Sequence, residues 1–208
     1  AATKAMMPDR ISLFSYAHLP ERFAAQRKFA PETLPSSEEK AALYNLAVNG
    51  FKRVGYEMIG LDHFALRSDS LAIAKHKGKL HRNFQGYTLR GDTDLIGVGV
   101  SAISTIGNAF AQNAKDLKEY YKRIDRQLPS AKVGLSLTPD DLVRRDVISS
   151  LMCNLSVDKQ SISSKHHIIF DEYFSEALSN LERLADDGII EISAHHIRVP
   201  EHARIFIR

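Results

Sequence analysis

The sequence predicts a mixed α/β fold, and two patterns carry that prediction. The first is an apolar run over Ile11–Tyr16, a helical pattern that begins at Ser36, and a second apolar run over Tyr56–Ile59. Strand, helix and strand in this order are the βαβ pattern of a parallel sheet. The second pattern begins at Thr138, where helices are followed by two short strands. It predicts a small, mainly helical, winged-helix-like domain at the C-terminal end.

Composition and length place the chain among ordinary globular proteins. It has 208 residues, of which 44% are hydrophobic and 25% charged, enough for a buried core. No apolar run approaches the ~18–20 residues of a membrane span. Leu128-Pro129-Ser130 is the best candidate for a boundary, so we expect one domain over residues 1–128 and another over 129–208.

The net charge and the cysteine content indicate which cellular compartment and which classes of partner to expect. The net charge of +3 is mildly basic, but Lys122-Arg123 and Arg144-Arg145 are only short pairs on expected helices. Solvated helix faces are the favoured interpretation, so we expect neither nucleic acid nor a membrane as partner. The single cysteine, Cys153, excludes an internal disulfide framework and fits a reducing compartment. With no secretion signal at the start, we expect a cytoplasmic protein.

The start of two helices is predicted by the residues that stand there. Ser36-Ser37-Glu38-Glu39 is a capping box, and an apolar face follows it, made of Leu43, Leu46, Ala47, Phe51 and Val54. Thr138-Pro139 starts the first C-terminal helix, with proline at the first helical position. We expect further helices near 117–128, 158–165 and 171–187, and strands over 189–192 and 196–199.

The most site-like stretch is His81-Arg82-Asn83-Phe84-Gln85-Gly86-Tyr87-Thr88. It gathers basic, amide and aromatic side chains around a glycine, which is the chemistry of a site rather than of a core. The run Leu95–Val100, with glycines at 97 and 99, is expected to form a buried strand that lets a ligand or another backbone come close. Together they predict a ligand-facing edge of the α/β fold.

These segments also carry a family resemblance. The run from His81 to Thr88, residues 97–104, residues 14–20 (Phe-Ser-Tyr-Ala-His-Leu-Pro) and residues 60–65 (Gly-Leu-Asp-His-Phe-Ala) resemble the oxygen-independent coproporphyrinogen III oxidase family, whose members are radical S-adenosylmethionine (SAM) enzymes. The blocks stand in the family's order with matching separations. The resemblance implies an α/β fold that is the C-terminal part of a partial (β/α) radical-SAM barrel, followed by the winged-helix-like domain.

The same resemblance implies a reaction and its cofactors. The whole enzyme would use SAM and a [4Fe–4S] cluster to remove a hydrogen and CO2 from two propionates of coproporphyrinogen III, leaving vinyl groups and giving protoporphyrinogen IX. Such clusters need three thiolates from a Cys-x3-Cys-x2-Cys loop, and one cysteine cannot supply them. We therefore expect the cluster ligands in a missing N-terminal half, no metal ligands here, an electron donor as a further partner, and no activity from this segment alone.

The resemblance also points to particular residues. Ala17, Phe84, Gln85 and Ile103 match positions that line the SAM region in the family, so they are expected to bind the cofactor. Arg82 and Arg90 are a separate hypothesis: their planar guanidinium groups suit the propionates of the substrate. No catalytic residue is assigned.

Other functions find less support in the sequence. The histidine pairs at 166–167 and 195–196 lack the spacing of a zinc site. Gly97-x-Gly99 lacks the third glycine and the acidic residue of a dinucleotide fingerprint, and Cys153 lacks a neighbouring base. Haem-binding chaperone-like paralogues, the main alternative, usually carry a His-Asn-x-x-Tyr-Trp motif, whereas this chain contains no tryptophan. A winged helix that binds nucleic acid would need its basic residues on one helix.

Overall fold

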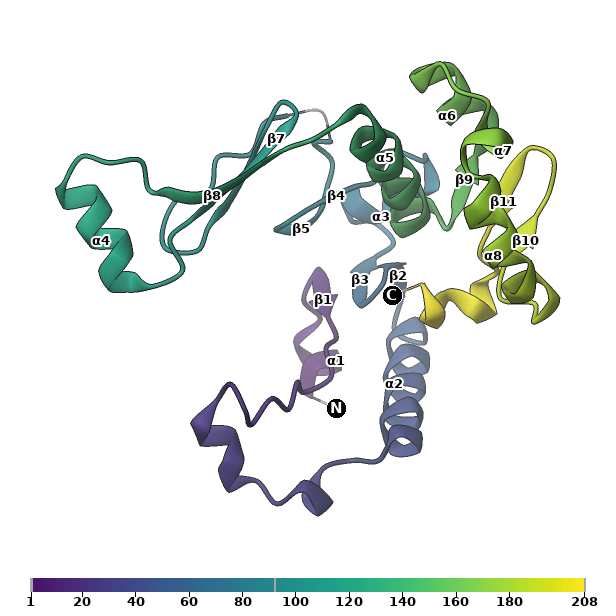
Figure 1. The fold of residues 1–208 in the computed structure, drawn as a ribbon. Coiled ribbons are helices and arrows are strands. Elements are labelled where there is room, and N and C mark those ends of the chain that lie inside the picture. The colour runs from purple at the N-terminus through teal and green to yellow at the C-terminus, as the bar shows by residue number, and fades with distance from the viewer. Residues whose placement is uncertain (1, 92, 208) are drawn as a thin grey trace. The chain divides into compact units, whose positions relative to one another are not determined.

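The computed structural model describes residues 2–91 and 93–207 and divides into two compact units, Ala1–Lys79 and Leu80–Arg208 (Figure 1). Each unit combines helices with an antiparallel sheet, so the mixed α/β class is confirmed. The boundary expected at 128–130 stays a prediction. Within the described ranges, no helix has both the length and the apolar character needed to cross a bilayer.

The first unit is built around a three-stranded sheet in the order β1-β3-β2. Its helices lie before, between and after the strands. In chain order the elements are α1 (Ala2–Met6), β1 (Arg10–Ser12), the 3-10 helices η1 (Ala24–Lys28) and η2 (Pro31–Thr33), α2 (Ser37–Lys52), β2 (Tyr56–Gly60), β3 (His63–Leu66) and α3 (Ser70–His76).

The parallel pairing predicted for this unit is wrong. β1 and β2 run in the same direction, but β3 lies between them and pairs antiparallel with both. The reason is that the chain turns back at Leu61-Asp62 directly after β2, which places β3 beside the distant β1. The strand expected over Ile11–Tyr16 is also shorter than predicted, since regular pairing ends at Ser12. Residues 13–19, including Ala17, continue without helix or strand.

Aromatic residues form the core of the first unit. Phe51 from α2 packs on Tyr56 and Phe64 of the sheet, with ring centroids 5.8 and 5.2 Å apart. The predicted capping box of α2 is confirmed: the Ser36 hydroxyl accepts from the Glu39 N–H, and the Glu39 carboxylate accepts from the Ser36 N–H. Only the C-terminal part of the predicted apolar face is covered, since Leu43 and Leu46 are exposed.

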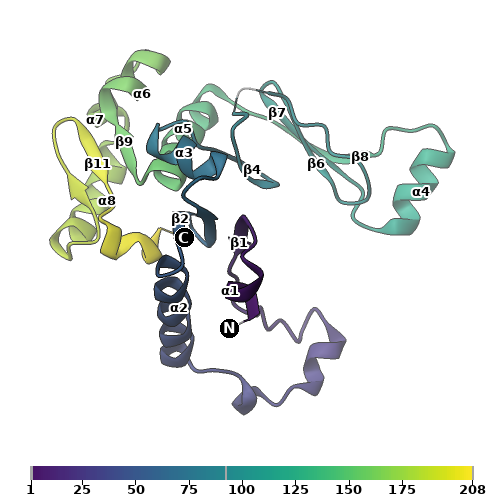
Figure 2. The same ribbon diagram turned by 180° about the vertical axis from the view of Figure 1, so that it is seen from behind.

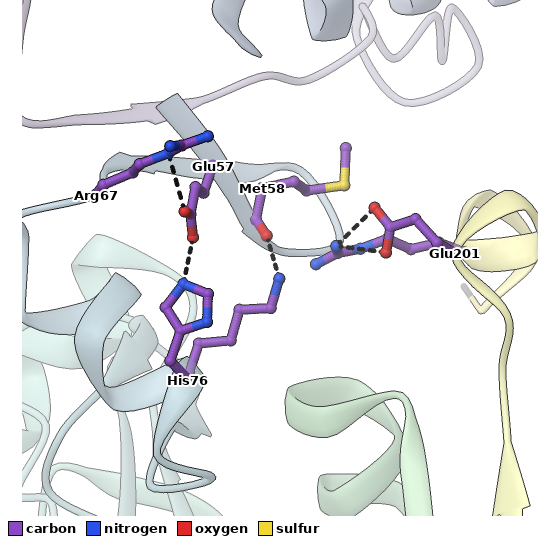
Figure 3. Close-up of polar contacts among 7 residues, drawn as sticks. Glu57, Met58, Arg67, His76 and Glu201 are labelled. Atoms are coloured by element: carbon purple, nitrogen blue, oxygen red, sulfur yellow. Dashed lines mark hydrogen bonds and ion pairs between the residues drawn. The ribbon is translucent and has the colours of Figure 1, made fainter. Parts of the chain in front are cut away.

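Polar contacts join α3 to the sheet (Figure 3). The Glu57 carboxylate on β2 lies between the Arg67 guanidinium, at 3.2 Å, and His76 Nε2, at 2.6 Å. The Lys75 ammonium donates to the Met58 carbonyl at 2.7 Å. The contacts of His76 and Lys75 fix α3 against β2, because each joins one element to the other.

The second unit begins with a hairpin and a three-stranded antiparallel sheet in the order β6-β7-β8. Figure 1 shows α4 at one end of this sheet, and Figure 2 shows β6 beside β7 from behind. The elements are β4 (His81–Asn83), β5 (Gly86–Thr88), β6 (Ile103–Ile106), β7 (Ala109–Asn113), α4 (Leu117–Asp125) and β8 (Ala131–Ser136). The sequence predicted α4 and none of these strands.

The C-terminal part of the unit contains four helices and another three-stranded sheet, in the order β10-β11-β9. The sequence predicted most of these elements. However, the helix expected over residues 171–187 is interrupted at Phe174, and strand β9 was not predicted. The elements are α5 (Pro139–Asn154), β9 (Ser156–Asp158), α6 (Lys159–His166), α7 (Phe170–Tyr173), α8 (Ser175–Asp186), β10 (Glu191–Ile192), β11 (His196–Arg198) and the 3-10 helix η3 (Glu201–Phe206).

The core of this part forms where the sheet meets α5 and the following helices. Val143 of α5 packs with Val157, Ile162 and Phe170, and Ile197 on β11 closes the cluster. The predicted cap of α5 is confirmed, because the Thr138 hydroxyl accepts from the Asp141 N–H at the start of the helix.

We expect Val157→Ala to lower the free energy of unfolding by about 2–3 kcal/mol, because it deletes two methyl groups and leaves a cavity in a packed core. Val157 is 0% exposed. Val98→Ala is the matched control: the same atoms are removed from a side chain that is 88% exposed, so the loss should stay within about 0.5 kcal/mol. Urea unfolding checks both, and equal losses would contradict the packing described here.

Candidate functional site

The predicted site stretch forms the β4–β5 hairpin, and its tip presents Phe84 and Gln85. Asn83 pairs with Gly86 across the hairpin, so the two residues between them form the turn. Gly86 adopts a φ of 121°, which favours glycine. The Asn83 side chain accepts from the Gln85 N–H at 2.8 Å and fixes the turn. The result is an aromatic ring and an amide held side by side on a short, well-defined turn.

The other end of the hairpin is attached to α5. The Arg82 guanidinium lies 5.7 Å from the centre of the Tyr87 ring, and the Tyr87 hydroxyl donates to the Met152 carbonyl at 3.1 Å. Burial raises the pKa of Tyr87 to about 12. Burial likewise raises the pKa of the Cys153 thiol to about 11, so the buried structural thiol expected from the sequence is confirmed. Arg82 therefore lies over the Tyr87 ring while remaining exposed.

The tip of the hairpin lies over one face of the β6-β7-β8 sheet. The Phe84 ring stands edge-on to Phe110 of β7, with centroids 5.4 Å apart, and remains 55% exposed. Directly paired residues of an antiparallel sheet point to the same side. The register therefore gives Phe84 and Ile103 a common face, which is made of Ile103, Thr105, Phe110, Gln112, Val133 and Leu135.

The glycine-containing run does not form the buried strand that was predicted. Only Leu95 pairs with β6, through two 2.8 Å backbone hydrogen bonds with Thr105. Ile96 and Val98 are exposed, so this part of the prediction is wrong. The physical reason is that side chains, instead of a neighbouring strand, bind four backbone groups of residues 97–101, which we call the glycine segment.

Asn113 makes two of those contacts. Its buried side-chain amide donates to the Gly99 carbonyl at 2.8 Å, with the Gly97 carbonyl 3.4 Å away. The amide oxygen accepts from the Ser130 hydroxyl at 3.0 Å, which sets the orientation of the amide. One residue at the end of β7 thus joins the glycine segment to the start of β8.

The glycine segment in turn lies directly against Ile103. A Cβ atom on Gly97 would stand 2.7 Å from the Ile103 carbonyl oxygen, closer than side chains are found. The Gly97 N–H donates to the Ser104 hydroxyl at 2.9 Å, which holds the approach in place. The glycine at this position is therefore explained by close backbone packing beside a predicted cofactor residue.

The remaining predicted residues are less enclosed. Ala17 belongs to the first unit, whereas Phe84, Gln85 and Ile103 belong to the second. Ala17 is exposed, and its carbonyl accepts from the Gln26 side chain at 3.1 Å. Arg90 is exposed just beyond β5, where its N–H donates to the Thr88 hydroxyl. The structure thus brings Phe84 and Ile103 to one sheet face, with Gln85 beside Phe84 at the hairpin tip and Arg82 over the Tyr87 ring.

The residues of the candidate site suit SAM but not the [4Fe–4S] cluster. A flat, half-open aromatic ring, an exposed amide and an apolar sheet face suit an adenine and a thioether chain. The cluster does not fit, because the one cysteine is buried and its raised pKa keeps it protonated. No group of three His, Cys, Asp or Glu side chains with metal-binding geometry occurs among residues 2–91 and 93–207.

Comparisons with known proteins define the class. Residues 137–206 match the family described as HemN C-terminal domain. A solved structure of the Escherichia coli coproporphyrinogen III oxidase (HemN), described as a radical SAM enzyme, superimposes with a TM-score of 0.96 at 47% identity. The match covers 100% of this chain and 48% of that one. The chain therefore has the fold of the C-terminal region of a radical SAM protein with a HemN C-terminal domain.

Curated relatives show the same similarity along almost the whole chain. The chain is 48% identical to the oxygen-independent coproporphyrinogen III oxidases of Salmonella typhimurium and E. coli, over 97% of its own length. A relative of that name from Thermostichus vulcanus is 39% identical over the whole chain. The chain is similar to the C-terminal half of the first two relatives. It spans 44% of the first two relatives and 64% of the third.

Sequence reasoning missed two residues that shape the site. Phe110 supports the Phe84 ring, and Asn113 holds the glycine segment. A signal was present for both, because Gly107-Asn108 is a two-residue hairpin turn that predicts paired strands on either side. With β6 and β7 recognised, the polar Asn113 at the end of an apolar strand would have stood out.

We expect Gly97→Ala to displace Ile103 and to destabilise the protein by about 1–3 kcal/mol, because the new methyl group overlaps backbone that must move. Gly134→Ala is the control: its Cβ would meet the Phe110 carbonyl at 3.5 Å, an ordinary contact. Thermal unfolding and a crystal structure of each variant measure the effect. A Gly97→Ala protein as stable as Gly134→Ala, with Ile103 unmoved, would show that the close approach is not required.

Proposed function

We propose that the protein containing this chain is an oxygen-independent coproporphyrinogen III oxidase, which converts coproporphyrinogen III to protoporphyrinogen IX in haem biosynthesis. The observation that carries the proposal is 48% identity over 97% of the chain to relatives of that name. In the whole enzyme, SAM and a [4Fe–4S] cluster would supply the radical chemistry. The cluster ligands would come from outside these residues, and an electron donor would be a further partner.

The role of this chain in that enzyme is to bind and position. Phe84 would offer its exposed ring to the cofactor, Gln85 would donate and accept hydrogen bonds, and Ile103 would provide an apolar wall. The stiffness of the hairpin turn and the glycine segment supports this role, because binding is tighter when the groups are already in place. Ala17 is the matching cofactor-binding residue of the first unit.

The structure favours Arg90 over Arg82 for substrate carboxylates. Arg82 lies over the Tyr87 ring at the base of the hairpin, so its guanidinium already has a packing partner. Both arginines are exposed, and Arg90 lies on the segment that leaves β5. A planar fork on an exposed segment suits a propionate group, and we infer that Arg90 is the better candidate of the two.

We also propose the finer architecture expected from the sequence, in which the chain is the C-terminal part of a partial (β/α) barrel followed by a winged-helix-like domain. The helices α5–α8 with the sheet β10-β11-β9 support the second part. A haem-binding chaperone-like paralogue is the competing hypothesis, and the relatives' names favour the oxidase. A cytoplasmic location, supported by one unpaired cysteine, stays a prediction.

The full-length protein tests the proposal directly. After anaerobic cluster reconstitution, it should convert coproporphyrinogen III to protoporphyrinogen IX with consumption of SAM. Phe84→Ala should weaken SAM binding about tenfold or more, because it removes an exposed aromatic face. Ile106→Ala, at an exposed residue of the opposite sheet face, is the control and should bind SAM normally. Haem binding without turnover would instead support the chaperone hypothesis.

For the arginines, we expect Arg90→Met to raise the KM for coproporphyrinogen III about tenfold or more while SAM binding is unchanged, since a charge-assisted contact is lost. Arg82→Met should affect stability more than substrate binding, because it removes the cation from the Tyr87 ring. Steady-state kinetics and thermal unfolding separate the two effects. An Arg90→Met enzyme with a normal KM would remove Arg90 from the substrate site.

A further inference from the structure

The segment that contains Ala17 lies beyond the end of regular strand pairing. Regular pairing of β1 stops at Ser12, and residues 13–19 adopt neither helix nor strand. Backbone N–H and C=O groups need hydrogen-bond partners, so a segment without them moves unless side chains take over. A residue that must present its backbone to a ligand therefore needs another form of support here.

Gln26 supplies that support. Its side-chain Oε1 accepts from the Leu19 N–H at 2.5 Å, and its Nε2 donates to the Ala17 carbonyl at 3.1 Å. A primary amide carries a donor and an acceptor in one rigid plane. The two hydrogen bonds reach backbone groups on either side of His18, so one side chain fixes the whole stretch Ala17–Leu19.

The amide is itself held by the loop that contains it. Gln26 lies in η1 (Ala24–Lys28), where its N–H donates to the Phe23 carbonyl at 2.9 Å. The Phe23 N–H donates to the Leu19 carbonyl at 3.0 Å, so the loop returns to the segment that it supports. Phe29, directly after η1, meets the Tyr16 ring edge-on at 6.0 Å. The contacts on both sides of Gln26 thus keep η1 beside Ala17.

We propose that Gln26 is a positioning residue of the SAM site, which acts through the backbone of Ala17. The inference rests on the proposed function, because it takes Ala17 as a residue that lines the cofactor. By holding the Ala17 carbonyl and the Leu19 N–H, Gln26 keeps this stretch in one conformation before the cofactor arrives. Preorganisation of this kind increases affinity by removing the cost of ordering the site during binding.

The test uses the full-length protein with its cluster reconstituted, and SAM as the probe. Gln26→Met keeps the length of the side chain and removes both hydrogen bonds. We expect the Kd for SAM, measured by equilibrium dialysis without substrate, to rise about fivefold to tenfold, the effect of one or two ordinary hydrogen bonds. Under turnover the KM for SAM should rise equally, with kcat at saturating SAM nearly unchanged.

Arg27→Met is the matched control. Arg27 is the next residue of η1, and its Nε donates to the Pro20 carbonyl at 2.9 Å. The variant therefore loses a hydrogen bond of the same loop that does not reach Ala17 or Leu19, and it should bind SAM within about twofold of the parent. If Arg27→Met weakens SAM binding as much as Gln26→Met does, general loosening of the loop explains the result and the proposal fails.

Gln26→Glu separates the two hydrogen bonds. A carboxylate still accepts from the Leu19 N–H, but it turns an oxygen toward the Ala17 carbonyl in place of a donor. SAM binding as weak as in Gln26→Met supports the contact with Ala17. Normal binding by Gln26→Glu overturns that contact. Hydrogen exchange of the peptide that contains Leu19, in the absence of SAM, should be faster in Gln26→Met and unchanged in Arg27→Met.

An Ala17→Val variant distinguishes failure of this inference from failure of the proposed site. If Ala17→Val weakens SAM binding and Gln26→Met leaves it within about twofold, Ala17 lines the cofactor and Gln26 does not position it. If neither variant changes SAM binding, Ala17 is outside the cofactor site and both statements fall. Faster exchange at Leu19 with normal SAM binding also overturns the inference, because the segment would then be ordered by Gln26 without effect on the cofactor.

Discussion

The buried amide of Asn113 is the contact on which the candidate site of the second unit depends. Its hydrogen bonds to the Gly99 carbonyl and from the Ser130 hydroxyl hold three stretches of chain at one point. The glycine segment can then approach β6 so closely that Gly97 meets the backbone of Ile103. A buried, fully bonded amide of this kind is costly to disturb, since each lost partner leaves a polar group without solvent. The position of Ile103 is therefore set from outside its own strand.

The sequence predicted the elements whose signals are local. Ser36 and Thr138 predict the start of their helices because the capping side chain and the backbone N–H that it binds lie within three residues of each other. Strand pairing is different, since it depends on which distant segment lies alongside. The run Ile11–Tyr16 has the composition of a buried strand, yet the turn after β2 places β3 beside β1 and makes the sheet antiparallel. No local pattern carries that information.

The candidate site was predictable in its residues but only in part in its geometry. Phe84 and Gln85 stand out from the sequence because aromatic and amide side chains beside a glycine are unusual for a core. Their place at a hairpin tip over Phe110 follows from β-pairing, which the Gly107-Asn108 turn indicated. The glycine segment was misjudged because apolar residues that alternate with glycine resemble a strand. Ile96 and Val98 are exposed instead, since Ser104 and Asn113 bind the backbone that a neighbouring strand would have bound.

Two stretches of irregular backbone, one that carries Ala17 and one that lies beside Ile103, are thus each held by a side-chain amide. Gln26 binds the Ala17 stretch, and Asn113 binds the glycine segment beside Ile103. A strand would fix such a stretch equally well, but it would use one edge of the backbone completely and bring its own side chains. A single amide uses two groups and leaves the others free for a ligand. Each of the two stretches is therefore held in place while part of its backbone stays available to a ligand. Gln26 and Asn113 look like any other amide residues in the sequence, so their supporting role is recognised only once the fold is known.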